Sequence, residues 1–192
     1  MKPNLFRGTA VAFVVGLALH VPVRVDATDT TSDELVGGNQ VLEWNQIFID
    51  TLIATNTPNS SSQRLGAIVH TAIFDAYNGI ERRFAPIFVH DTAPPGASRR
   101  AAVIAAAYTA LASLFPSRQA ALDASYAASL AALSDDAEDG GKSRERGIDW
   151  GKEVANRVLA WRAADGFSGS YPAFRGGTEV GQWRPTPPCS GR

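Results

Sequence analysis

The sequence predicts an all-α protein: a helical bundle of about five helices followed by an irregular C-terminal tail rich in glycine, proline and aromatic residues. Apolar residues recur every three or four positions in five segments between Val41 and Ala164, which is the period of an amphipathic helix. No segment shows a convincing strand pattern, and no period of 20–50 residues indicates a solenoid. Alanine is abundant in two of the five segments, so their helices can approach neighbours to about 8 Å.

Length and composition limit the possibilities further. The chain has 192 residues, 45% of them hydrophobic, which suits a single domain with a packed core. The formal net charge is -1. Arg82-Arg83 and Arg99-Arg100 are isolated pairs, and we interpret them as solvated helix ends. Binding to nucleic acid is therefore not expected, because it needs a clustered basic surface.

Residues 1–27 have the pattern of a signal peptide. Lys2 and Arg7 are followed by an apolar run from Thr9 to Leu19, and small residues precede the predicted cleavage point after Ala27. The run is shorter than the roughly 20 residues that span a bilayer, so stable membrane insertion is not expected. An uncleaved membrane anchor is the alternative. We expect a secreted or periplasmic protein.

After cleavage, 15 basic and 18 acidic residues of the original 18 and 19 would remain, a net charge of -3. Residues 28–40 are polar and are predicted to form a flexible leader. The helical domain is expected over 41–165. Cys189 is the only cysteine, so no internal disulfide can form and stability must come from packing.

The first two predicted helices lie on either side of a proline. The first begins at Val41 and ends before Asn56-Thr57-Pro58-Asn59, because proline disfavours the helical conformation in its predecessor. Ser60, Ser61 or Ser62 is predicted to cap the second, which should run to about Asn78. That helix is apolar on most sides, so we expect it to be buried on several sides.

One narrow polar seam remains on the second helix. Arg64, Thr71, Asp75 and Asn78 are spaced so that they share one face. A carboxylate on a largely buried helix needs a partner, so Asp75 is predicted to bind backbone N–H groups or an arginine from another helix. His70 lies about 140° from Asp75 around the helix, so the two should not pair.

Three more helices and the tail complete the chain. An alanine-rich helix is predicted from Ala97 or Ser98 to Pro116, and Ser117 can cap a fourth that reaches Leu133. The last should extend from about Ser143 to Ala164, with Trp161 on its apolar side and Gly166 in the position of a C-terminal glycine cap. Residues 166–192 show no period, yet they carry four aromatics that normally need a surface: Phe167, Tyr171, Phe174 and Trp183. This irregular tail resembles a truncated connector.

Four phrases occur together and in order. They are AIVHTAIFDAYNGIERRFAP (67–86), PPGASRRAAVIAAAYTALASLFPS (94–117), GIDWGKEVANRVLAWRAADG (147–166) and GQWRPTPP (181–188). In this order and spacing they resemble the N-terminal region of secreted bacterial vanadium-dependent haloperoxidases, in the type-2 phosphatidic acid phosphatase superfamily. The resemblance covers about residues 41–188. It implies a helical bundle that holds vanadate or phosphate, with halide oxidation or phosphate-monoester hydrolysis as the activity.

The residues that perform this chemistry in the family are missing here. The family's site is built from Lys-x6-Arg-Pro, Pro-Ser-Gly-His and Ser-Arg-x5-His-x3-Asp, and none of the three occurs in this sequence. The one Arg-Pro, Arg184-Pro185, has no lysine at the required distance. We therefore assign no catalytic, cofactor-binding or metal-binding residue, and we expect no cofactor in this chain although complete family members hold vanadate.

Other chemistry finds equally little support in the sequence. Only His70 and His90 remain after the signal peptide, and no metal-binding spacing of histidines or cysteines is present. We interpret His70 as a buried histidine bonded to a backbone carbonyl. No Gly-x-Ser-x-Gly is present to indicate a serine hydrolase.

Two functions follow as alternatives. The chain is either the scaffold half of a haloperoxidase-like or acid phosphatase-like protein, truncated before the catalytic motifs and inactive alone, or a stand-alone exported helical binding or structural protein. The first predicts the missing C-terminal half as a partner. An uncovered apolar surface on the isolated chain also predicts self-association.

Overall fold

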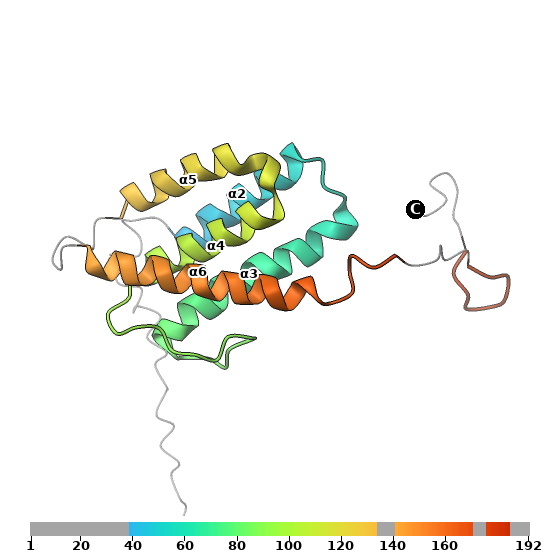
Figure 1. Cartoon of the computed structure of the whole chain (residues 1–192). Helices are drawn as coiled ribbons and strands as arrows, with labels where there is room; N and C mark the ends of the chain where they lie inside the picture. The colour runs from blue at the N-terminus through green and yellow to red at the C-terminus, as the bar shows by residue number, and fades with distance from the viewer. Residues whose placement is uncertain (1–38, 134–140, 171–175, 185–192) are drawn as a thin grey trace, which may run out of the picture.

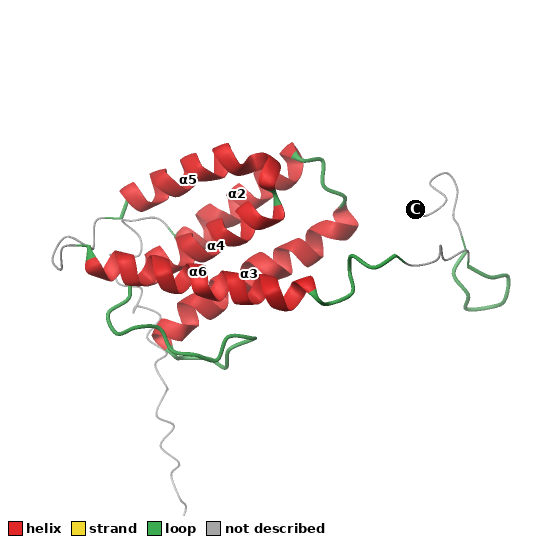
Figure 2. Cartoon of the chain, viewed as in Figure 1, coloured by secondary structure: helices red, strands yellow, loops and turns green. Residues whose placement is uncertain are grey.

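Five α-helices, and no strands, occur in the residues that the computed structural model describes, which are 39–133, 141–170 and 176–184 (Figures 1 and 2). This confirms the predicted all-α helical bundle. The helices are α2 (Gln40–Ala54), α3 (Asn59–Glu81), α4 (Arg99–Leu114), α5 (Gln119–Ala131) and α6 (Lys142–Ala163), with a short 3-10 helix, η1 (Pro116–Arg118), before α5.

The alanine-rich helix α4 is the centre of the bundle and packs against all four other α-helices. Ser98 caps it, because the Ser98 hydroxyl accepts a hydrogen bond from the Ala101 N–H at 3.3 Å. Its residues 101–107 are all buried, so the whole circumference of two helical turns is covered. Alanine on every side lets several neighbours approach α4 at once.

Two glycines bring α6 into backbone contact with α4. A Cβ atom added at Gly147 would overlap the carbonyl oxygen of Ser98, and one added at Gly151 would overlap that of Ala102. The two glycines are four residues apart and therefore lie on the same side of α6. Between them Trp150 turns toward α3, where its indole N–H donates to the Ala76 carbonyl at 2.9 Å. Helices α3, α4 and α6 thus form one tightly packed unit.

Helix α3 begins and ends differently from the prediction. It starts at Asn59 without a side-chain cap, because the N-cap residue is Pro58, whose side chain has no acceptor. The Pro58 carbonyl accepts the N–H groups of Ser61 and Ser62, which is the ordinary start of a helix. The predicted serine cap is therefore wrong. The helix also continues past Asn78 to Glu81, where Arg82 adopts a left-handed conformation with φ of 58°.

The start of α5 needs a similar correction. Pro116 does end α4, but η1 follows at once, and α5 begins at Gln119 with no side-chain cap, so Ser117 does not cap it. Leu122 and Leu133 are buried. Trp161 on α6 is partly exposed and does not belong to the core. Gly166 has the expected left-handed backbone (φ 82°) and lies two residues beyond Ala164, the C-cap of α6.

Candidate functional site

Two buried side chains hold the loop between α3 and α4 against α3. Asp75 is fully buried, and one of its carboxylate oxygens accepts the Ile87 N–H at 2.8 Å. The other accepts the N–H groups of Phe88 at 2.8 Å and Val89 at 2.9 Å. Asn78 binds the same loop nearer its start, donating to the Phe84 carbonyl and accepting from the Phe84 N–H. The prediction that Asp75 binds backbone N–H groups is confirmed.

Two large apolar side chains of this loop are exposed to solvent. Phe84 is 63% exposed and Ile87 is 55% exposed. The Phe84 ring contacts Phe74 of α3, with centroids 6.3 Å apart. Phe88 stacks on Trp161 of α6 at 4.4 Å, with the ring planes 7° apart. We call these five side chains, Phe74, Phe84, Ile87, Phe88 and Trp161, the aromatic face.

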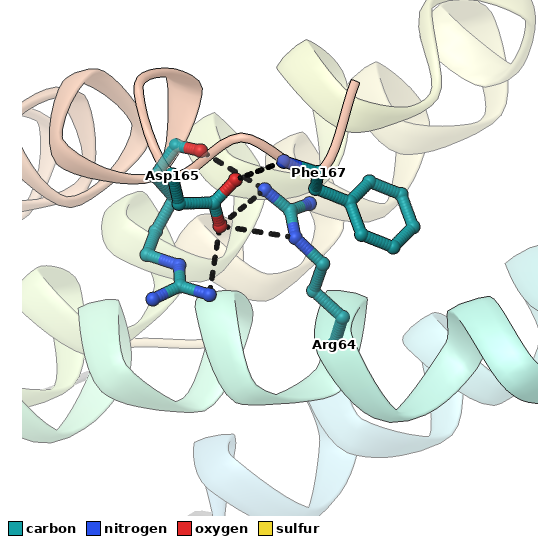
Figure 3. A network of polar contacts seen from close by, with 4 residues as sticks. Arg64, Asp165 and Phe167 are labelled. Carbon is teal, nitrogen blue, oxygen red and sulfur yellow. Dashed lines mark hydrogen bonds and ion pairs between the residues drawn. The ribbon is translucent and has the colours of Figure 1, made fainter. Parts of the chain in front are cut away.

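A cluster of charged residues lies at the end of α6, beside Trp161. Arg64 of α3 donates from Nη2 to Asp165 at 2.8 Å and to the Arg162 carbonyl at 2.9 Å, while its Nε reaches Asp165 at 3.2 Å. Arg162 binds the same carboxylate oxygen at 2.8 Å. Figure 3 shows these contacts and the Phe167 ring beside Arg64, whose guanidinium lies 4.3 Å from the ring centroid. We call Arg64, Arg162, Asp165 and Phe167 the arginine clasp.

The arginine clasp fixes the point at which the chain leaves α6. The remaining oxygen of Asp165 accepts the Phe167 N–H at 3.0 Å. This hydrogen bond is the main cause that holds the pKa of Asp165 below its usual value. The hydrogen bond and charge of Arg64, and the charge of Arg162, lower that pKa further. The clasp residues and Gly166 line an open surface depression of about 610 Å³.

The clasp does not fit vanadate. A vanadate site of the haloperoxidase type needs several cationic donors and two histidines around one oxyanion. Here both guanidiniums bind the protein's own Asp165, and no histidine lines the depression. We therefore derive no catalytic step from this site.

The histidines lie elsewhere. His70 Nε2 is 3.0 Å from the side-chain oxygen of Asn45 on α2, so its partner is an amide side chain and the predicted backbone carbonyl is wrong. Partial burial lowers the pKa of His70. His90 is exposed in the loop. Among the described residues, no group of three or more His, Cys, Asp or Glu side chains is placed to hold a metal ion.

The described part of the tail remains open to solvent. Residues 176–184 form a turn closed by the Gly177 N–H and the Trp183 carbonyl, and in Figure 1 this turn lies apart from the helices. Phe167 and Trp183 are both exposed. Tyr171, Phe174 and Cys189 lie outside the described residues, as does the predicted signal peptide.

No single helix in the described residues is long and apolar enough to cross a membrane. Helix α4 and the segment Pro116–Ala131 reach that length together, but they meet at 114°. No family model matches the sequence, and no curated protein or solved structure matches it either.

Sequence reasoning missed the arginine clasp. It placed Arg64 on the polar seam of its helix but left its partner open, and Asp165 was not singled out. The local signal was the spacing of Arg162 and Asp165, which are three residues apart at a helix end and can therefore pair. Nothing in the sequence links them to Arg64, which lies about a hundred positions earlier.

Proposed function

We propose that this chain is the scaffold half of an exported protein of the vanadium-dependent haloperoxidase type, and that it has no turnover of its own. The observation that carries the proposal is the order and spacing of the four resembling phrases across residues 41–188. Each phrase alone is short. Four of them in order, in a chain whose described part is an all-α bundle, favour a common scaffold.

The positions of these phrases in the fold support a scaffold role. The first contains Asp75 and Asn78, which hold the α3–α4 loop. The third contains Gly147 and Gly151, which let α6 contact α4, together with Asp165 of the arginine clasp. The resembling segments thus carry residues that set the geometry of the bundle.

The local chemistry supports inactivity of the chain alone. Stabilising a transferring oxyanion requires donors that are free to bind it and a nearby group that transfers protons. Arg64 and Arg162 are engaged by Asp165, and His70 is engaged by Asn45.

An activity assay tests this proposal directly. The purified chain is incubated with orthovanadate, then assayed for peroxide-dependent bromination of a reporter dye and for hydrolysis of p-nitrophenyl phosphate. We expect background rates in both. We also expect the chain to bind a separately produced C-terminal half of a bacterial vanadium haloperoxidase that carries all three family motifs. Vanadate-dependent turnover by the chain alone, or no binding to that half, contradicts the proposal.

A second candidate is a stand-alone exported binding protein. The exposed aromatic side chains of the loop and the tail favour it, because large apolar side chains grouped on a surface commonly mark a contact site. The same binding experiment separates the two candidate functions, because a stand-alone binding protein is not expected to bind a haloperoxidase C-terminal half.

A further inference from the structure

We propose that Tyr108 and Tyr126 form an oxidation site, at which a one-electron oxidant couples the two phenol rings into a dityrosine link between α4 and α5. This inference does not depend on the proposed function, because it rests only on the geometry of these side chains and their neighbours. Three observations support it: the contact between the two rings, a carboxylate placed to take a proton, and an adjacent tryptophan whose N–H has no acceptor.

The two rings are already in contact. Tyr108 of α4 and Tyr126 of α5 are stacked, with the ring centroids 4.2 Å apart and the ring planes 19° apart. The two helices lie side by side (Figure 1), and α5 packs chiefly against α4. Both residues are partly exposed, so a small oxidant in solution can reach them. Two radicals formed on these rings therefore meet without a diffusive search, which favours their coupling over other reactions.

A carboxylate is placed to take the proton that Tyr108 loses on oxidation. The Tyr108 O–H donates to Asp123 at 2.7 Å, and the Gln119 amide donates to the Tyr108 oxygen at 3.0 Å and to Asp123 at 2.6 Å. The hydrogen bond to Asp123, together with desolvation, raises the pKa of Tyr108, so the phenol keeps its proton at neutral pH. Asp123 can accept that proton along the existing hydrogen bond as the electron leaves, which makes Tyr108 easier to oxidise.

The neighbouring Trp44 directs oxidation toward the tyrosines. Its ring packs edge-on against Tyr108, with the centroids 6.4 Å apart. Trp44 is fully buried, and its indole N–H has no hydrogen-bond acceptor within the described part of the chain. A radical cation on Trp44 has no group to which it can release its proton, and a buried charge is costly. An electron therefore moves from Tyr108 to Trp44, and the oxidation ends on Tyr108.

The coupling is a two-electron oxidation. Each ring gives one electron to the oxidant, which is reduced, and each ring loses its phenolic proton: that of Tyr108 to Asp123 and that of Tyr126 to solvent. The two phenoxyl radicals then form a C–C bond between ring carbons ortho to the oxygens. The C–H bond on each of these carbons breaks and the adjacent oxygen gains a proton, which restores both phenols. The product has lost two hydrogen atoms, and two equivalents of the oxidant have been reduced.

The test is photo-oxidation of the full chain by tris(bipyridine)ruthenium(II) and persulfate, which supply a one-electron oxidant. The monomer is then isolated and digested with trypsin, which places Tyr108 and Tyr126 in separate peptides, 101–118 and 119–142. We expect a linked species whose mass is the sum of the two peptides less two hydrogen atoms. Tyr126→Phe should lose this species, whereas the matched control Tyr77→Phe, at a partly buried position of α3, should keep it. Asp123→Asn should lower its yield at short exposure, because the proton acceptor is lost.

The link should also change the stability of the fold. It joins α5 to the central helix α4, and a cross-link restricts the unfolded chain. The cross-linked monomer should therefore unfold at a higher urea concentration than the untreated protein, and treated Tyr126→Phe should show no such increase.

Three results would overturn the proposal. The first is the absence of the linked peptides from folded wild-type protein that has consumed the oxidant, a result that needs no variant. The second is an unchanged yield in a Tyr126→Phe protein that circular dichroism shows to be folded, because the link would then use another residue. The third is an equal yield from wild type unfolded in urea before the treatment, because the stacking of the two rings would then not direct the coupling.

Discussion

The substitution Asp75→Asn removes one charge and one acceptor from the buried contact between α3 and the loop. One oxygen of Asp75 accepts two N–H groups and the other accepts one, at 2.8–2.9 Å. An asparagine oxygen can keep the pair from Phe88 and Val89, but its NH2 group then faces the Ile87 N–H, and that donor loses its partner. An unpaired buried donor costs about 1–3 kcal/mol, and hydrogen bonds to a neutral acceptor are weaker than those to a charged one.

Allowing for the smaller desolvation of a neutral amide, we expect the free energy of unfolding to fall by about 2–4 kcal/mol. For a helical domain of this size, that corresponds to a decrease in Tm of about 10 °C. The measurement is urea denaturation followed by circular dichroism at 222 nm, with hydrogen exchange of the Ile87, Phe88 and Val89 amides as a local readout. Asp91→Asn is the matched control, because this loop carboxylate is 60% exposed and pairs only at the surface with Arg157. Equal stability of D75N, D91N and wild type would refute the reasoning.

Three further predictions test other parts of the fold. Gly151→Ala should destabilise the protein by about 1–3 kcal/mol despite alanine's better helix propensity, because the added Cβ overlaps the Ala102 carbonyl. The control Lys152→Ala, at an exposed position of α6, should change the urea midpoint little. Asp165→Asn should increase hydrogen exchange of the Phe167 amide at neutral pH. Because the pKa of Asp165 is lowered in the folded state, the wild-type contact is complete above the unfolded pKa and is lost as the pH falls through the folded pKa. Protection of the Phe167 amide that does not depend on the ionisation of Asp165 would contradict this. The pKa of His70 is lowered in the folded state, so as the pH falls His70 is protonated in the unfolded state before it is protonated in the folded state. The free energy of unfolding should therefore decline below about pH 6.5. His70→Gln should remove that part of the pH dependence of the urea midpoint.

The number and order of the helices could be predicted because the signal is local. Periodic apolar residues and prolines define each segment, and the structure has its five helices in the expected places. The caps were less predictable. Three serines after Pro58 have the composition of capping residues, but the helix already begins at Asn59, so all three lie inside it and the N-cap is Pro58, whose side chain has no acceptor.

Contacts between distant segments could be predicted only in part. The polar seam indicated that Asp75 needs a partner, and backbone N–H groups are that partner. Which loop supplies them could not be predicted, because residues 82–93 have no period that fixes their path. The pairing of Arg64 with Asp165 could not be predicted from the sequence either, since it depends on how α3 and α6 cross. The sequence analysis did not single out Gly147 and Gly151, although two glycines four residues apart on a predicted helix are a local signal of close helix contact.

The polar seam of α3 also explains why the aromatic face has a defined shape. Arg64 holds the chain after α6, Asp75 holds the tip of the loop, and Asn78 holds its start. Apolar contacts are non-directional, whereas these hydrogen bonds specify where the backbone lies.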